Sequence, residues 1–345
     1  MDSKQIEQII EDEGIEKYRA EQIRQAIFQE HASSFNGITT LKKDLRERLS
    51  EKYPLLSFEL YRLFESSDKT TFKALLKLSD GKIIETVLMN PKPGHWTTCI
   101  SSQVGCALAC TFCATGTMGL LRNLRSEEIT DQVLFWRQFI GERKIAERLN
   151  NVVYMGMGEP FQNTKNVFDS LDELMNPDTF HMGARHLSVS TAGIVKPIYQ
   201  MADRFPQVNL ALSLHIADDE KRTELMPINK AWPLAKLAEA LTDYIEKTHR
   251  KVFIEYILLR DETDKRDNAK QLIKYLKTIK PTHLVHVNLI VYNETESSHK
   301  QTSKDHARWF KNYLEENGIS ATIRKNLGRD IDGACGQLVV QQENI

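Results

Sequence analysis

The spacing of hydrophobic positions predicts a helical start followed by strands. Residues 1–52 carry apolar side chains at helical intervals, as at Ile6, Ile9 and Ile10, which predicts a small module of short amphipathic helices. Residues 53–92 instead contain apolar runs separated by turns rich in Ser, Asp and Gly, which predicts an antiparallel lead-in to the main domain. The strand-like runs are 58–64, 71–76 and 83–88.

Residues 93–345 alternate between strand-like and helical spacing. Runs rich in Val, Ile and Leu are separated by stretches with helical apolar periodicity, which implies a parallel sheet with helical crossovers. No Gly-x-Gly-x-x-Gly motif opens a helix, so the α/β fold that we expect is an incomplete parallel (β/α)6 barrel rather than a doubly wound, dinucleotide-binding sheet. The six predicted strands are 97–101, 151–157, 186–191, 208–214, 251–258 and 284–290.

Composition and charge limit the class of protein. The 345 residues are 41% hydrophobic, which is enough for the core of one large domain. No long apolar stretch or signal-peptide pattern is present, so we expect a cytoplasmic globular protein without a membrane partner. The 46 basic and 47 acidic residues argue against a polycation that coats nucleic acid. Local basic groups are ordinary solvated faces unless they converge around one cleft, where they would form a surface that binds RNA phosphates. These groups are Lys42, Lys43, Arg46 and Arg48; Arg122 and Arg125; and Arg324, Lys325 and Arg329.

Three of the five cysteines, Cys106, Cys110 and Cys113, fall in one short segment. An odd, crowded triplet does not suit a disulfide framework, whereas three thiolates on one loop can turn toward a metal or a metal cluster. Structural zinc normally takes a fourth protein ligand, and no His or Cys lies close downstream to supply it. An iron–sulfur cluster held by three thiolates keeps one iron open for a cofactor. Three unrelated buried thiols are the alternative, which the rarity of Cys disfavours.

Polar residues and glycines follow the predicted strands at their carboxyl ends. In a barrel of parallel strands these ends gather at one mouth, where functional groups are found. We therefore expect the cysteine loop, which follows the first strand, to face the residues that follow the other strands. These residues are Gly158, Glu159, Ser190, Ser213, His215 and Asn293.

The Cys-x-x-x-Cys-x-x-Cys motif, with Phe112 before its last Cys, resembles the cluster loop of the radical S-adenosylmethionine superfamily. Further motifs look like the RNA adenine-C2 methyltransferases (RlmN-type) of that superfamily, and the N-terminal helices resemble the accessory module of these enzymes. The motifs extend through the whole catalytic region. They are 101–106, 155–160, 190–193, 213–215, 225–229, 286–290 and 330–338.

The resemblance implies two cofactors. Cys106, Cys110 and Cys113 would bind a [4Fe–4S] cluster whose open iron is chelated by S-adenosylmethionine, and reductive cleavage of the sulfonium would give a 5′-deoxyadenosyl radical. A flavodoxin- or ferredoxin-type protein would donate the electron. The residues that would contact S-adenosylmethionine are Gly158, Glu159, Ser190, Ser213, Leu214, His215 and Asn293.

The resemblance also implies roles for the other two cysteines. Cys335 would accept a methyl group from one S-adenosylmethionine, and a second equivalent would generate the radical that activates this methyl group for addition to the base. Cys99 would then attack the sulfur of Cys335 and release the product as a transient disulfide forms. Glu85 matches the proton acceptor, with an ordinary polar position on a half-exposed strand as the alternative. Gly333 and Gly336 flank Cys335 and suit a mobile loop.

The implied substrates are RNAs. The family methylates C2 of adenine 2503 in 23S rRNA and, in at least some members, C2 of adenine 37 in tRNA. A paired base cannot enter such a site, so the target should lie in a loop or be flipped out.

Three alternatives are open. The sister activity methylates C8 of the same rRNA adenine and confers antibiotic resistance (Cfr-type); Pro160 and Val104 favour C2, whereas residues 114–119 favour C8. A non-catalytic zinc protein that binds RNA is the second alternative, and a radical enzyme that acts on a peptide or a small molecule is the third.

Overall fold

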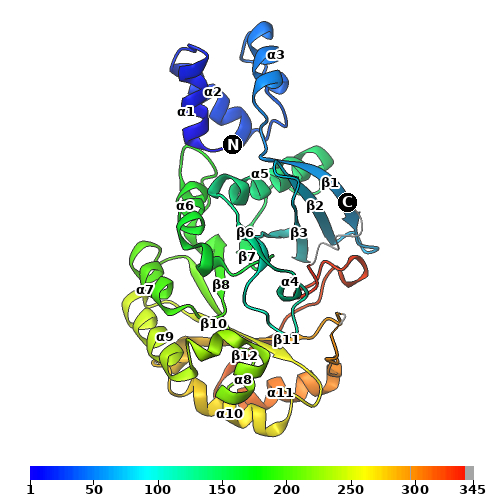
Figure 1. Cartoon of the computed structure of the whole chain (residues 1–345), viewed down its shortest axis with the longest axis vertical. Helices are drawn as coiled ribbons and strands as arrows, with labels where there is room; N and C mark the ends of the chain where they lie inside the picture. The colour runs from blue at the N-terminus through cyan, green and yellow to red at the C-terminus, as the bar shows by residue number, and fades with distance from the viewer. Residues whose placement is uncertain (296, 339–345) are drawn as a thin grey trace.

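The computed structural model describes residues 1–295 and 297–338. One ten-stranded sheet organises this part of the chain, in the order β1-β2-β3-β4-β7-β8-β9-β10-β11-β12. Helices surround the sheet, and the N-terminal helices form a separate block at one end of the molecule (Figure 1). None of the helices in the described residues is long and apolar enough to cross a membrane.

The first strands of the sheet are antiparallel and continue directly into the barrel. They match the three runs predicted before residue 92, and the fourth strand pairs with the third in antiparallel register. The strands are β1 (Phe58–Glu65), β2 (Thr71–Leu78), β3 (Ile83–Lys92) and β4 (His95–Cys99).

From β4 onward all neighbouring strands of this sheet are parallel. The edge strands β1 and β12 do not pair with each other in the described residues, so the barrel stays open. The predicted α/β class and the incomplete parallel barrel are therefore confirmed, with a seventh parallel strand that the sequence did not reveal. The strands are β7 (Asn151–Tyr154), β8 (Leu187–Thr191), β9 (Asn209–Ser213), β10 (Val252–Leu258), β11 (Val285–Val291) and β12 (Ser320–Ile323).

The crossover helices bury the apolar faces that their periodicity predicts. Leu237, Leu241 and Ile245 recur at intervals of four on one helix and are all fully buried. Trp136 is also fully buried, and its indole N–H donates to the Thr86 hydroxyl of β3 at 3.0 Å, which fixes its helix on the sheet. The helices are α5 (Ser126–Arg143), α6 (Thr164–Met175), α7 (Val195–Arg204), α8 (Asp219–Leu225), α9 (Leu234–Thr248), α10 (Arg266–Leu276) and α11 (Lys304–Glu316).

The N-terminal block consists of α1 (Ser3–Asp12), α2 (Tyr18–Arg24) and α3 (Lys43–Lys52). Asp2 caps α1, and its side chain accepts from the backbone N–H of Gln5 at 2.8 Å. Arg137 of α5 joins the block to the barrel, because its guanidinium donates to the carbonyls of Phe180 at 2.7 Å and Phe28 at 3.4 Å.

A two-stranded hairpin that the sequence analysis did not predict supports the cysteine loop. It pairs β5 (Gln103–Cys106) with β6 (Gly119–Asn123) in antiparallel register, and the short helix α4 (Ala114–Thr117) lies between them. At Gly105, where φ is +77°, a Cβ would lie 1.9 Å from the carbonyl oxygen of Gly119. Only glycine fits this crossing, so the two ends of the loop are held together by backbone contact.

A close backbone approach between β4 and β7 gives the first prediction. At Gly156 an added Cβ would lie 2.6 Å from the carbonyl oxygen of Ile100, which is backbone and cannot move aside cheaply. We expect Gly156→Ala to lower the free energy of unfolding by about 1–3 kcal/mol, measured by denaturant unfolding. The control is Gly37→Ala, because a Cβ there meets nothing within 4 Å; it should stay within about 0.5 kcal/mol. Equal stability of the two variants would contradict the close approach.

Candidate functional site

A cavity at the carboxyl ends of the parallel strands brings most of the predicted site residues together. The cysteine loop forms one wall, and the turns after β7, β8 and β9 form the others. The predicted residues that line it are Cys106, Cys110, Cys113, Gly158, Glu159, Ser190, Ser213, His215 and Cys335. Leu214, Asn293, Cys99 and Glu85 do not line the cavity but lie behind its walls or beside it, as described below.

The cysteine loop is a compact turn held by its own backbone. The N–H of Cys113 donates to the carbonyl of Cys110 at 3.1 Å, and the N–H of Gly116 donates to the carbonyl of Cys113 at 3.0 Å. Cys106 is buried, whereas Cys110 and Cys113 are partly exposed. Burial is the main cause that raises the pKa of Cys106 to about 12, and it raises the pKa values of the other two thiols as well. A cationic partner would reverse this shift, because it stabilises the thiolate form.

The donor set of the cavity suits an iron–sulfur cluster. Three thiols of one short loop, Cys106, Cys110 and Cys113, line the cavity. Three thiolates can hold such a cluster and leave one iron open to a cofactor, whereas structural zinc normally takes a fourth protein ligand.

Glu159 ties two walls of the cavity together. One carboxylate oxygen accepts from the Thr191 hydroxyl at 2.7 Å and from the N–H of Phe161 at 3.0 Å, and the other accepts from the N–H of Ala192 at 2.8 Å. Burial raises its pKa, and these hydrogen bonds oppose the shift. The carboxylate, which the sequence analysis named as a contact of S-adenosylmethionine, thus already has three protein donors. The Glu159 carboxylate therefore holds the turn after β7 against the turn after β8.

Gly158 is required by the same turn. Its φ is +98°, and a Cβ would lie 2.5 Å from the Cβ of Gln103 on β5. The amide oxygen of Gln103 accepts from the N–H of Glu159 at 2.8 Å. The turn after β7 is therefore packed directly onto the strand that enters the cysteine loop.

Another wall of the cavity is formed at the ends of β8 and β9 and contains Ser190, Ser213 and His215. The hydroxyls of Ser190 and Ser213 lie 3.2 Å apart, and the ring of His215 meets Phe112 edge to face at 4.8 Å between centroids. Burial lowers the pKa of His215 to about 3, so its imidazole is neutral at pH 7. Its Nδ1 is buried and has no hydrogen-bond partner in the described residues, which suits a polar ligand in the cavity.

Asn293 and Leu214 lie just behind this wall. The side-chain N–H of Asn293 donates to the carbonyl of Cys335 at 3.1 Å, while its buried Oδ1 has no partner in the described residues. Leu214 is fully buried, and its N–H donates to the carbonyl of Glu255 at 3.1 Å. Asn293 therefore positions the segment that carries Cys335.

The segment around Cys335 lies across the cysteine loop. The N–H of Ala114 donates to the carbonyl of Gly336 at 2.8 Å, and the Thr115 hydroxyl donates to the carbonyl of Leu338 at 2.6 Å. Cys335 is exposed, and its charge raises the pKa values of both Cys113 and Cys99. Cys335 itself lines the same cavity as the three cysteines of the loop.

Cys99 is buried at the end of β4, behind the cavity. Burial is the main cause that raises its pKa to about 12; the charge of Cys335 adds to the shift, and Arg324 opposes it. The thiol is thus protonated near neutral pH, and its surroundings contain one cation that favours the thiolate.

Glu85 lies on β3 beside the cavity and is 1% exposed. The ammonium of Lys73 lies 3.5 Å from its carboxylate and also donates to the carbonyl of Asp332 at 3.3 Å. The alternative of a polar position on a half-exposed strand is therefore wrong. The carboxylate is fixed beneath the segment that leads to Cys335.

Two charged residues that line the cavity were not placed there by the sequence analysis, which named Arg324 only among the basic groups and did not name Glu255. Glu255 of β10 is buried, and its carboxylate pairs with the guanidinium of Arg324 at 3.1 Å and accepts from the side chain of Asn288 at 2.8 Å. A carboxylate within the apolar run Val252–Leu258 was the available signal. Arg324 could not be placed, because it follows a strand of only four residues that contains a single large apolar side chain.

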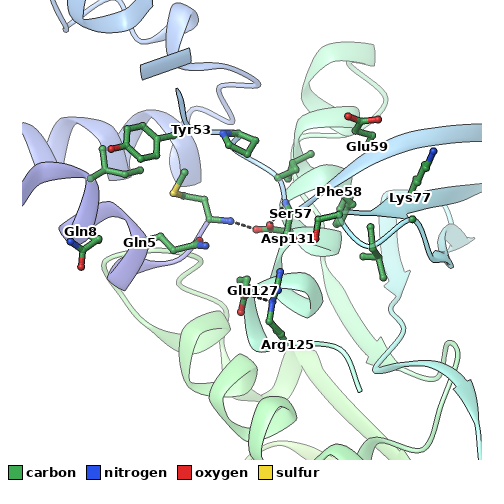
Figure 2. A pocket seen from close by; sticks show the side chains of 17 residues that line it. Gln5, Gln8, Tyr53, Ser57, Phe58, Glu59, Lys77, Arg125, Glu127 and Asp131 are labelled. Atoms are coloured by element: carbon green, nitrogen blue, oxygen red, sulfur yellow. Dashed lines mark hydrogen bonds and ion pairs between the residues drawn. The ribbon is translucent and has the colours of Figure 1, made fainter. Parts of the chain in front are cut away.

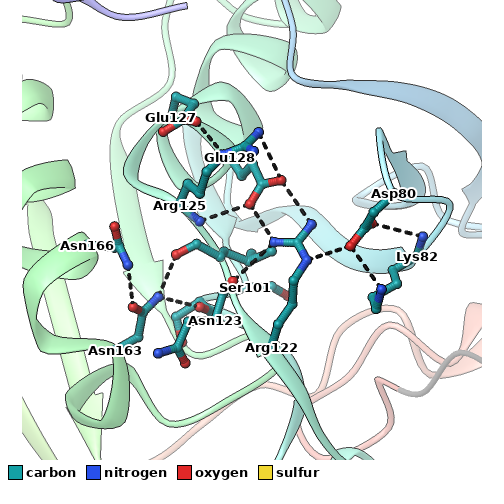
Figure 3. Close-up of polar contacts among 12 residues, drawn as sticks. Asp80, Lys82, Ser101, Arg122, Asn123, Arg125, Glu127, Glu128, Asn163 and Asn166 are labelled. Carbon is teal, nitrogen blue, oxygen red and sulfur yellow. Dashed lines mark hydrogen bonds and ion pairs between the residues drawn. The ribbon is translucent and has the colours of Figure 1, made fainter.

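Arg122 and Arg125, which form one of the predicted basic groups, make ion pairs within the protein (Figure 3). The guanidinium of Arg122 binds both oxygens of the buried Glu128 at 2.8 and 3.0 Å and Asp80 at 2.7 Å. Arg125 pairs with Glu127 and Glu128. Arg324 also differs from the expectation, because it is turned into the cavity toward Glu255. Each of these three cations therefore already has a carboxylate partner within the protein.

A second, larger hollow lies between α1 and the start of the sheet (Figure 2). Four of its charged groups are paired, Arg125 with Glu127 and the amino group of Met1 with Asp131, and Glu59 and Lys77 also line it. No Cys or His lines it among the described residues. We interpret it as the boundary between the helical block and the barrel.

Comparisons with known proteins agree with this geometry. The chain matches the Radical SAM superfamily over residues 100–295 and the "Ribosomal RNA large subunit methyltransferase N-terminal domain" over residues 1–54. It is 41% identical to the "Probable dual-specificity RNA methyltransferase RlmN" of Halalkalibacterium halodurans, over 97% of this chain and 90% of the relative. A relative of the same description from Staphylococcus aureus is 40% identical, with the same coverage. The crystal structure of a radical SAM methyltransferase from Sphaerobacter thermophilus aligns with a TM-score of 0.91 and 38% identity, over 98% of this chain and 97% of that chain.

The cysteine loop gives the second prediction, which separates iron from zinc. We expect protein purified without oxygen to be brown and to contain iron and acid-labile sulfide, and we expect Cys110→Ala to lose both, because three thiolates are the minimum that holds such a cluster. Cys99→Ala is the matched control and should keep its iron. A colourless native protein with one equivalent of zinc would reject the cluster.

Proposed function

Because this chain belongs to the RlmN family of radical S-adenosylmethionine RNA methyltransferases, we propose that it methylates C2 of adenine 2503 in 23S rRNA and C2 of adenine 37 in tRNA. The observation that carries the proposal is the placement of two further thiols around the cavity. Cys335 lines the cavity and its segment lies across the cysteine loop, while Cys99 is buried at the end of β4, behind the cavity. A radical enzyme that only cleaves S-adenosylmethionine needs neither of these thiols.

The cofactors would be held by the walls of the cavity. Cys106, Cys110 and Cys113 would hold the [4Fe–4S] cluster, and the unpartnered Nδ1 of His215 offers a polar contact for S-adenosylmethionine. When bound, the two cofactors supply a 5′-deoxyadenosyl radical. Such chemistry suits the substrate, because adenine C2 is an aromatic carbon without nucleophilic character and cannot attack a sulfonium directly.

Cys335 would carry the methyl group. Its exposed sulfur would take a methyl group from one S-adenosylmethionine, which would leave as S-adenosylhomocysteine, and would become S-methylcysteine with loss of the thiol proton. The 5′-deoxyadenosyl radical from a second equivalent would remove one hydrogen atom from this methyl group, and the resulting sulfur-bound methylene radical would form a bond to adenine C2. Two equivalents of S-adenosylmethionine are used in one turnover. The hydrogen bond from Asn293 to the carbonyl of Cys335, together with the positive φ of Gly336, supports a defined loop that can approach both cofactor and base.

Cys99 would release the product. The adduct would first lose its C2 hydrogen as a proton and return one electron to the [4Fe–4S] cluster. The thiolate of Cys99 would then attack the sulfur of Cys335. The sulfur–carbon bond breaks, a disulfide forms, and the carbon leaves as the methyl group of the product with one added proton. Arg324 favours the thiolate form, whereas burial disfavours it. Glu85 is the proposed acceptor of the C2 proton, and its ion pair with Lys73 fixes the carboxylate.

The substrate would enter as an unpaired or flipped base, and a flavodoxin- or ferredoxin-type protein would supply electrons. The rival C8 activity would use the same five cysteines. One local feature favours it, the sequence of residues 114–119, which forms α4 and the loop after it. The position of the new methyl group on adenine therefore decides between the two.

Product analysis gives the third prediction. We expect mass spectrometry of nucleosides from a 23S rRNA fragment, treated with the reduced enzyme and S-adenosylmethionine, to show 2-methyladenosine. Cys335→Ala should abolish it, since no other exposed thiol in the described residues is available to carry the methyl group. Formation of only 8-methyladenosine would reject the C2 assignment. Full activity of Cys335→Ala would reject the thiol carrier and favour a radical enzyme that acts on another substrate.

The role of Cys99 gives the fourth prediction. We expect Cys99→Ala to form the bond between Cys335 and the base but not to break it, so that a protein–RNA adduct accumulates. Denaturing electrophoresis followed by RNase digestion and mass spectrometry should place the RNA on Cys335. Cys99→Ala/Cys335→Ala should form no adduct. Multiple turnover by Cys99→Ala without an adduct would show that Cys99 is not needed for release.

A further inference from the structure

A groove beside the cavity is lined by many cations. Among the described residues that line it, six are Lys or Arg and none is Asp or Glu. The whole chain carries 46 basic and 47 acidic residues, so this local excess is not a reflection of the overall charge. The cationic residues are Arg260, Lys304, Arg308, Arg324, Lys325 and Arg329.

Four of these six cations have no acidic partner among the described residues, and one of the four donates to a backbone carbonyl instead. Arg324 pairs with Glu255, and Arg308 pairs with Asp305. Lys325 donates to the carbonyl of Pro91 at 2.9 Å. The other three, Arg260, Lys304 and Arg329, are exposed and take part in no ion pair within the part of the chain that the structure describes. Their charges are therefore available to an anion.

The uncharged polar side chains of the groove are already engaged with the protein. The amide of Gln301 donates to the carbonyl of Tyr292 at 2.8 Å, and the amide of Asn326 donates to the carbonyl of Val291 at 3.0 Å. The Thr302 hydroxyl donates to Asp264 at 2.7 Å. Recognition by the groove would therefore be electrostatic rather than specific for one base, which is typical of contacts to a phosphate backbone.

The groove is continuous with the proposed active site. It lies at the carboxyl ends of β11 and β12, where Val291 and Ile323 end their strands, and Arg324 lines both the groove and the cavity. The helix α11 also begins here, after Ser303, whose hydroxyl caps it. The positive end of this helix dipole adds to the charge of the side chains.

We infer that this groove binds the phosphates of the RNA strand next to the target adenine. The inference rests on the proposed function, and it names Arg260, Lys304 and Arg329 as the residues that contact the backbone. An unpaired strand whose base enters the cavity must continue past its rim. Because Arg324 is shared by both spaces, the cationic groove lies along one of the paths that the strand can take. An acidic surface of an electron-donor protein is negatively charged, as RNA is, and could also bind the groove. A comparison of electron donors distinguishes such a protein from RNA.

The test is the salt dependence of RNA binding. We expect Arg260→Gln/Lys304→Gln/Arg329→Gln to bind a hairpin carrying the target adenine more weakly than the native protein does, measured by fluorescence anisotropy between 50 and 200 mM salt. The slope of log K against log salt concentration should become shallower by about 0.7 for each lost contact, and so by about 2 for the triple variant. Lys311→Gln is the matched control, since Lys311 lies on α11 but pairs with Glu315 outside the groove. Its slope should equal that of the native protein.

Two further measurements separate the possible failures. Thermal unfolding checks that the triple variant is folded, and mass spectrometry checks that Cys335 still accepts a methyl group in the absence of RNA. An unchanged slope in a folded triple variant, with a native enzyme that methylates RNA, overturns the groove and leaves the proposed function intact. A native enzyme that binds the hairpin with the expected salt dependence but never methylates it overturns the proposed function alone. A variant that loses turnover only with a protein electron donor, and not with dithionite, assigns the groove to that donor and overturns the RNA assignment.

Discussion

The docking of the segment 333–338 across the cysteine loop is the contact on which the proposed chemistry depends. It is made by backbone and hydroxyl hydrogen bonds, from Ala114 to Gly336 and from Thr115 to Leu338. These bonds do not require particular side chains at 336 and 338, so they fix the position of the chain while leaving the Cys335 side chain exposed. A carrier thiol needs this combination, because it must be near the cofactors and yet accessible to an RNA base. Hydrogen bonds to a loop are also weak enough, at about 0.5–1.5 kcal/mol each, to be exchanged during a reaction cycle.

The sequence allowed the class of fold and the position of most of the site to be predicted, because both depend on local patterns. Apolar runs and helical periodicity identified six of the seven parallel strands, and the rule that functional groups gather at their carboxyl ends then brought Ser190, Ser213 and His215 to one cavity. The four-residue strand β12 has too few apolar residues to show a pattern. Arg324, which follows it, could therefore not be placed, and neither could its pairing with Glu255, since an ion pair between residues 69 positions apart leaves no local signal.

The roles of charged residues were harder to predict than the fold. Arg122 looked like a phosphate-binding residue because it follows the cysteine loop, but it neutralises Glu128, which is fully buried at the start of α5. An unpaired carboxylate in the core lowers the stability of the fold by several kcal/mol. A nearby guanidinium therefore pairs with it and is not available to a ligand. Spacing along the chain does not reveal which carboxylates are buried. The distinction between a structural cation and a binding cation therefore required the tertiary structure.

The same distinction explains how a chain of nearly zero net charge can act on a polyanion. Some of its acidic residues pair with buried or structural cations, such as Arg122, Arg125 and Arg324, and this leaves other cations on the surface uncompensated, including those of the groove. Only uncompensated cations lower the free energy of RNA binding, because a paired cation must first lose its carboxylate partner. Net charge is thus a poor guide to nucleic-acid binding in this protein. A better guide is the number of exposed cations that lie close to the mouth of the active site and have no carboxylate partner. Arg260, Lys304 and Arg329 are such cations.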